Sequence, residues 1–138
     1  MTGYLLDTNI VSELRKRDGC HPNVRRWFAA LDDDAIFLSV LVVGEIRRGI
    51  ELIRRRDQMA GRALDRWLKG LERQFEERIL PVTVEICERW GRIGLDQPLP
   101  PIDGLLAATA MHHGLTLVTR NTAHAKRSGV AILNPFAE

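Results

Sequence analysis

Three acidic residues of this chain stand where a predicted strand ends or a predicted helix begins. Asp7 follows the apolar run Tyr4 to Leu6, Glu45 follows a second apolar run, and Asp103 comes just after the prolines at 98–101. In open α/β sheets, ligands bind beyond the carboxyl ends of the strands. Clustered carboxylates repel one another unless a cation neutralises them, and their hard oxygen atoms favour Mg²⁺ or Mn²⁺. Such an ion can activate water for phosphodiester hydrolysis.

Each acid also has an ordinary structural explanation. Asp7 or Asp103 could cap the N-terminus of a helix, and Glu45 could interact with the dipole of the helix that it begins. The prediction of a metal site therefore depends on all three acids lying at one edge of one sheet.

The elements that would position these acids can be read from the hydrophobic pattern. Five short apolar runs are typical of strands: Tyr4 to Leu6, Ile36 to Val40, Ile79 to Val82, Leu115 to Val118 and Val130 to Leu133. Segments with helical spacing alternate with them, which predicts an α/β sandwich with a parallel sheet and helices on both faces. A length of 138 residues with 45% hydrophobic content predicts a single domain over 1–138.

Helices are expected wherever apolar residues recur at steps of three and four. The stripe Val43, Ile46, Ile50 and Ile53 places Glu45 beside the buried face of one such helix. A later helix should run from about Asp103 to His113 and end at Gly114. The acidic run at 32–34 reads as a solvated turn rather than an ion site.

Composition narrows the function classes. The net charge is +2, and 17 of the 20 basic residues are arginine, the side chain that binds phosphate through two nitrogens, although a GC-rich genome would explain the bias equally well. Cys20 and Cys87 form no CxxC pattern, so neither a disulfide framework nor a zinc site is predicted. No apolar run reaches the length of a membrane span, and no export signal is recognised, so a cytoplasmic location is expected. Asn9 breaks the DxD pattern of aspartyl-phosphate enzymes, and no P-loop is present.

Four segments together closely resemble one family. They are LLDTNIVSEL, SVLVVGEIRRGI, PPIDGLLAATAMHHGLTLVTRN and GVAILNPF. They are similar to PIN-domain ribonucleases, in particular the VapC/FitB-like toxins of bacterial toxin–antitoxin pairs, and the similarity runs from Tyr4 to Phe136. The resemblance implies a sheet of about five parallel strands and a Mg²⁺- or Mn²⁺-dependent endoribonuclease.

Matching positions carry the family's site onto this chain. Asp7, Glu45 and Asp103 become catalytic metal ligands, and Asn121 completes the catalytic set. Three further residues would support the site: Thr8, Asn9 and Thr119.

The chain departs from its relatives at the fourth acid. Many relatives carry that acid at the Asn121 position or three residues further on, where this chain has His124. Asn121 can offer a neutral oxygen atom, so the number of metal ions stays open. His124 could be a ligand or a proton shuttle, but we expect a surface residue that merely replaces the acid.

The resemblance also implies partners. Relatives form homodimers or dimers of dimers and are neutralised by a small antitoxin, which alone contacts operator DNA. The amphipathic segment from Val43 to Phe75 could dock the antitoxin or the second subunit, or could simply pack into the core. Four arginines close to the acidic motifs are candidates for binding the RNA backbone: Arg15, Arg47, Arg48 and Arg120.

Two other functions remain open on the same fold. One is a structure-specific nuclease that processes DNA or RNA. The other is a degenerate, non-catalytic binding module, which the absence of a fourth acid at Asn121 and His124 keeps in consideration.

Overall fold

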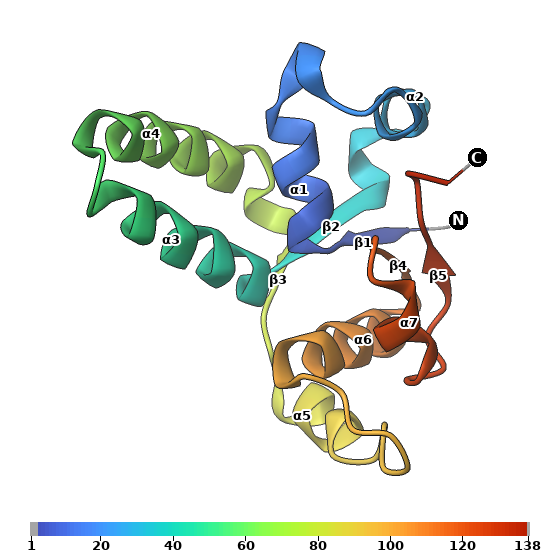
Figure 1. The fold of residues 1–138 in the computed structure, drawn as a ribbon. Helices are drawn as coiled ribbons and strands as arrows, with labels where there is room; N and C mark the ends of the chain where they lie inside the picture. Colours follow the sequence, from blue (N-terminus) through green and yellow to red (C-terminus); the bar gives the residue numbers. More distant parts are fainter. Residues whose placement is uncertain (1–2, 138) are drawn as a thin grey trace.

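A five-stranded parallel sheet forms the centre of the protein in the computed structural model, which describes residues 3–137 (Figure 1). The strands lie in the order β3-β2-β1-β4-β5. Their bounds are β1 Tyr4–Leu6, β2 Ile36–Ser39, β3 Ile79–Leu80, β4 Thr116–Val118 and β5 Ile132–Leu133. The chain builds one half of the sheet outward from β1 to β3 and then returns to the other side of β1 to build β4 and β5. The carboxyl ends of β1 and β4 therefore meet at the point where the strand order reverses, which is where ligands bind in such sheets.

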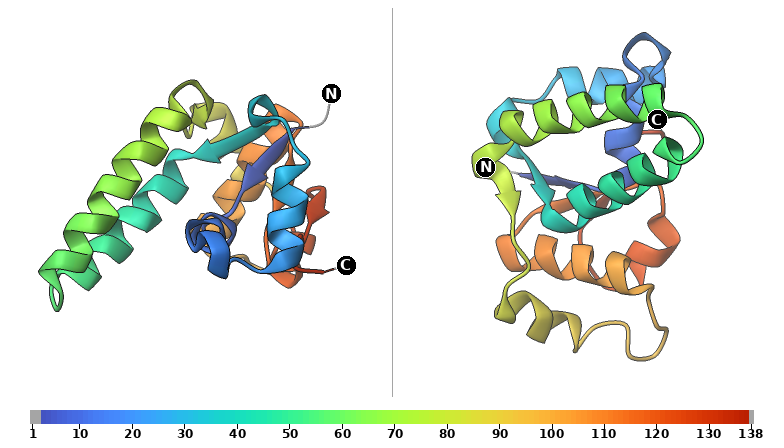
Figure 2. Two further views of the ribbon diagram at one scale, coloured as in Figure 1. Left: turned by 90° about the horizontal axis from the view of Figure 1, so that it is seen from above. Right: turned by 90° about the vertical axis from the view of Figure 1, so that its left-hand side faces the viewer.

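Helices cover both faces of the sheet, as predicted. Their bounds are α1 Thr8–Arg15, α2 Pro22–Ala29, α3 Val40–Arg54, α4 Gln58–Gln74, α5 Val84–Trp90, α6 Pro101–His113 and α7 Thr122–Lys126. Short 3₁₀ turns occupy Arg17–Gly19, Asp33–Ala35 and Glu76–Arg78. Helices α1 and α2 lie on one face, and α5, α6 and α7 lie on the other, as Figures 1 and 2 both show. This division follows from right-handed connections that run first one way and then the other along the sheet.

All five predicted strands are present, but each of the last four is shorter than expected. Val40 was predicted to end the second strand and instead begins α3, because the Ser39 hydroxyl caps that helix by accepting a hydrogen bond from the Leu41 amide at 3.0 Å. The third strand ends at Leu80 rather than Val82, and the fourth and fifth begin at Thr116 and Ile132. The apolar runs predicted where these strands lie but not the residues at which their pairing with neighbouring strands stops.

Helix α6 packs unusually closely between the sheet and α5. Its residues Gly104, Ala107, Ala108 and Ala110 are buried, and a Cβ atom at Gly104 would lie 2.9 Å from the ring of Trp90 in α5. The helix begins at Pro101, two residues before the predicted start, and ends as predicted at His113, with Gly114 in the left-handed conformation at φ 66°. Gly104 thus lets the start of α6, where Asp103 lies, approach Trp90 of α5 closely.

Helices α3 and α4 form a long hairpin that projects away from the sheet (Figure 2). The buried residues of α3 are Val42, Ile46 and Ile50, whereas Val43 and Ile53 of the predicted stripe are only half-buried. The hairpin is closed tightly at its tip, because a Cβ atom at Gly61 of α4 would lie 2.9 Å from Cβ of Arg54.

Two further expectations concern the surface. The acidic run at 32–34 is exposed, and Asp33 and Asp34 begin a short 3₁₀ turn, as expected of a solvated connection. Among the helices of residues 3–137, we find none with the length and apolar character needed to cross a membrane.

Candidate active site

Asp7 lies at the carboxyl end of β1 and begins α1. Its Oδ1 atom accepts a hydrogen bond from the Thr8 amide at 2.7 Å, so the carboxylate does cap the helix. Its Oδ2 atom accepts a second hydrogen bond, at 2.8 Å, from the hydroxyl of Thr119 at the end of β4. The side chain is thereby fixed across the point where the strand order reverses, and helix capping and membership of the site are compatible roles of one residue.

The environment of Asp7 disfavours a negative charge. The residue is 8% exposed, and this burial is the main reason why its pKa is raised above the ordinary value. Hydrogen bonds from Thr119 and Thr8 oppose the increase in the pKa, whereas the negative charges of Asp103 and Glu45 add to it. A cation bound beside Asp7 would remove both the burial penalty and this repulsion.

Asp103 lies in the same small cavity as Asp7. Thr119, Asn121 and His124 complete the polar part of the cavity lining, together with the apolar residues Leu106, Leu117 and Ala125. Asp103 is the third residue of α6, and Pro100 occupies the N-cap position, so the alternative that Asp103 caps this helix is wrong. The sheet edge and the start of α6 thus bring together two of the three predicted acids.

Glu45 is placed differently from the other two acids. It is the sixth residue of α3 rather than the first, it is exposed, and it does not line the cavity. The Thr8 hydroxyl donates a 2.5 Å hydrogen bond to its Oε1 atom, which joins Glu45 to the loop that carries Asp7. Its charge contributes to the raised pKa of Asp7.

The donor set suits a hard divalent cation, since it consists of carboxylate, hydroxyl and amide oxygen atoms. In the part of the chain that the structure describes, no three Asp, Glu, His or Cys side chains are close enough to hold one ion together. Asp7 and Asp103 therefore form the preformed part of the site, and Glu45 could join them only by a change of its side-chain conformation or through water.

His124 lines the cavity and contacts Asp103, so it is more than the surface residue that we expected merely to replace the acid. Its Nδ1 atom lies 2.8 Å from Oδ2 of Asp103, and its side chain is 39% exposed. The residue reaches Asp103 because α7 places position 124 one turn beyond Asn121 and against the start of α6. The position three residues after Asn121 of the TRN motif was the sequence signal that drew attention to His124.

The remaining polar residues connect the two loops of the site. The Thr119 hydroxyl, which donates to Asp7, accepts a 3.0 Å hydrogen bond from the Asn121 amide. The side chain of Asn9 accepts a hydrogen bond from the Arg120 amide at 3.3 Å and donates one to Asp7 at 3.4 Å. Thr119 and Asn9 thus hold the loops after β1 and β4 together, and Asn121 contributes to the cavity wall.

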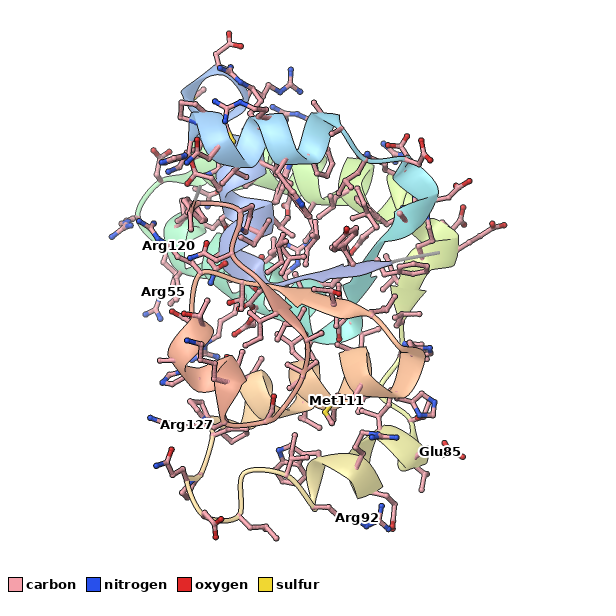
Figure 3. The ribbon with its side chains drawn as sticks, turned by 90° about the vertical axis from the view of Figure 1, so that its right-hand side faces the viewer. Arg55, Glu85, Arg92, Met111, Arg120 and Arg127 are labelled. Atoms are coloured by element: carbon pink, nitrogen blue, oxygen red, sulfur yellow. The ribbon has the colours of Figure 1, made fainter. Side chains whose placement is uncertain are left out.

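The four candidate arginines are not equivalent. Arg15, Arg48 and Arg120 are exposed, and the guanidinium of Arg120 lies over the ring of Phe136, 4.3 Å from its centroid. Figure 3 shows Arg120 and Arg127 at opposite ends of α7. Arg47 instead pairs with Asp65 of α4 at 2.5 Å and with Glu51 at 3.0 Å. These ion pairs engage Arg47 in the hairpin, so we leave it out of the proposed RNA contacts.

The family of this chain follows from comparison with known proteins. The PIN domain family model matches residues 4–130. The chain belongs to the PIN domain family. It is similar to the toxin FitB of Neisseria gonorrhoeae (strain ATCC 700825 / FA 1090), with 32% identity over 144 residues that cover 96% of this chain and 97% of FitB.

Two further similarities extend this result. The VapC ribonuclease Y4jK of Sinorhizobium fredii (strain NBRC 101917 / NGR234) is 29% identical over 140 residues, which cover 96% of each protein. Among solved structures, FitAcB from Neisseria gonorrhoeae superposes with a TM-score of 0.89 and 30% identity over 98% of this chain and 99% of that one. The similarity therefore extends over nearly the whole chain, including the five strands of the sheet.

Proposed function

We propose that this chain is a divalent-metal-dependent endoribonuclease that acts as the toxin of a toxin–antitoxin pair. One observation carries the proposal: Asp7, buried at the end of β1, shares a cavity with Asp103 and is fixed by Thr119 at the end of β4. The negative charge of Asp103 helps to raise the pKa of Asp7, so this pair of carboxylates is suited to a divalent ion. Membership of the PIN domain family, the ribonuclease name of one relative and the toxin name of another support the same function.

The acids take different parts in this proposal. Asp7 and Asp103 are the direct ligands of Mg²⁺ or Mn²⁺, and Glu45 completes the set directly or through water. Such an ion, when bound, supplies Lewis acidity and makes a bound water a nucleophile at neutral pH. Asp7 can bind the ion without a change of its side-chain conformation, because its two oxygen atoms are already held by the Thr8 amide and the Thr119 hydroxyl.

The neighbouring residues position the substrate. Asn121 presents an amide at the cavity wall, where it can contact the scissile phosphate or an ordered water. Asn9 and Thr119 keep the two loops in register around that phosphate, and Thr8 joins the first of them to Glu45. The exposed Arg15, Arg48 and Arg120 supply positive charge for the RNA backbone.

A toxin of this kind needs an inhibitor in the cell that makes it, so we propose a small cognate antitoxin as its partner. A cavity of about 170 Å³ opens between α1, α2 and α4 and is lined by apolar residues that include Leu14, Phe28 and Trp67. Arg15 and Arg17 also line it, and they would suit a partner segment that is apolar with acidic flanks. Operator DNA would be contacted only through the antitoxin. The single domain would act in the cytoplasm as a homodimer or a dimer of dimers.

The proposal is tested by incubating the purified protein with total RNA and Mg²⁺ or Mn²⁺, and by mapping the cleavage sites. We expect cleavage that EDTA stops. Asp7→Asn should reduce its rate by more than the roughly 10- to 100-fold that loss of an outer residue of a metal site costs. Asp34→Asn is the matched control, because Asp34 is an exposed acid of the 32–34 turn, and it should cleave like the wild type.

Three outcomes would contradict the proposal. Equal cleavage by the wild type and Asp7→Asn would exclude the proposed site. In a parallel incubation with structured DNA, cleavage of the DNA in place of RNA would favour the processing nuclease. No cleavage of either substrate, with growth arrest by both proteins on expression, would favour the non-catalytic binding module.

A further inference from the structure

We infer that His124 is a positioning residue that fixes the carboxylate of Asp103 for the divalent ion. The inference rests on the proposed function, because it assigns a role at the same site. The hydrogen bonds of the three acids follow a common pattern, and this pattern supports the inference.

Each of the three acids is hydrogen-bonded to a side chain from a different element. Thr119, after β4, donates to Asp7 at 2.8 Å, and Thr8 of α1 donates to Glu45 at 2.5 Å. For Asp103 the partner is His124 of α7, at 2.8 Å. In each case the hydrogen bond with the partner side chain involves one oxygen atom of the carboxyl group. For Glu45 and Asp103 these are the only partners among the interactions of the described residues, so the other oxygen atom stays available to an ion.

Asp103 depends on its partner more than Asp7 does. Asp7 is 8% exposed and is also held by the backbone amide of Thr8, whereas the Asp103 side chain is 26% exposed and has no backbone donor among residues 3–137. A carboxylate in the first turn of a helix can otherwise rotate toward solvent, and ion binding would then have to restrict that rotation. The imidazole contact restricts it beforehand.

The geometry makes His124 a hydrogen-bond donor to Asp103 and argues against a direct ligand. A carboxylate can only accept, so Nδ1 of His124 carries the proton that lies between the two side chains. The other ring nitrogen faces away from Nδ1, so it cannot contact an ion held at the free oxygen atom of Asp103 while this hydrogen bond exists. Metal sites commonly use such outer partners to orient their ligands.

Two substitutions at position 124 separate these roles. In His124→Asn, the side-chain amide nitrogen can replace Nδ1 as donor to Asp103, but the second ring nitrogen is lost. In His124→Ala, both are lost. His112→Ala is the matched control, because His112 is an exposed histidine in the last turn of α6.

The readout is the Mn²⁺ dissociation constant of the full-length protein, measured by titration calorimetry on variants whose melting curves show that they are folded. We expect His124→Ala to raise this constant by roughly 10-fold or more and His124→Asn to stay within about twofold of the wild type. His112→Ala should bind Mn²⁺ like the wild type.

The other results would overturn the inference. Unchanged binding by His124→Ala would show that Asp103 needs no partner, and equal loss in both variants would show that the second nitrogen is itself a ligand. Asp7→Asn separates the inference from the function on which it rests. If the wild type binds no Mn²⁺, or Asp7→Asn binds it equally well, both the proposed function and the role of His124 are contradicted. If Asp7→Asn loses binding and His124→Ala keeps it, only the role of His124 falls.

Discussion

Two aspartates of this protein, Asp7 at the sheet edge and Asp65 in the α3–α4 hairpin, have opposite electrostatic environments. Asp65 accepts hydrogen bonds from Arg54 and Arg47, and these two guanidinium groups lower its pKa to about 2. Asp7 is buried and has acidic neighbours in place of basic ones, and its pKa is raised. One residue type thus carries a stabilised charge in the hairpin and a destabilised charge at the sheet edge.

The difference shows how structural and functional acids can be told apart in this fold. In the hairpin, Glu51 also lies between Arg47 and Arg54, so every acid of the network has a basic partner from the protein itself. At the sheet edge, the partners of Asp7 are a hydroxyl, a backbone amide and the side-chain amide of Asn9, which orient the carboxylate without neutralising it. Such a cluster costs folding stability and keeps ligand atoms available, as is common at functional sites.

The largest contrast should come from making the same substitution at both positions. In metal-free buffer, Asp7→Asn should raise the melting temperature by about 2–5 °C, because it removes a buried charge and its repulsion by Asp103 and Glu45. Asp65→Asn should lower it by about 1–4 °C, because Arg47 and Arg54 lose a shared partner that is partly exposed. Differential scanning calorimetry measures both changes, and shifts of the same sign would contradict the contrast.

A smaller effect should appear when the same melting curves are repeated on acidification. The raised pKa of Asp7 means that its charge is a penalty present above that pKa and absent below the unfolded value of about 4. The lowered pKa of Asp65 means that its contribution is complete above about pH 4 and is lost only as the pH falls toward 2. The advantage of Asp7→Asn should therefore vanish before the deficit of Asp65→Asn does. The reverse order would contradict the assigned environments.

Much of the site could be predicted because it depends on local sequence. Asp7 and Thr119 each follow an apolar strand, and neighbouring parallel strands bring their carboxyl ends together at one edge. Asp103 was recognisable because it comes just after the prolines at 98–101, at the start of a predicted helix. For these residues, the residue type and the place in the sequence were enough to predict their place in the fold.

What the sequence could not show were contacts between distant residues. Arg47 was a reasonable candidate for RNA binding until the fold placed Asp65 of α4 beside it, since nothing in the local pattern of either helix specifies that pair. His124 was taken for a surface residue because its partner, Asp103, is 21 positions away and is reached only when α7 packs on α6. Glu45 was expected near the start of its helix, but the cap at Ser39 moved that start back to Val40.

The most direct test of the account is to locate Mn²⁺ by its anomalous scattering in crystals soaked with the ion. We predict density within coordination distance of Asp7 and Asp103, with Glu45 bound directly or through water. The hairpin network of Asp65 and Glu51 should hold no ion, because arginines already neutralise it. Density confined to the exposed acids at 32–34, with none at Asp7, would contradict the assignment of the sheet edge as the metal site.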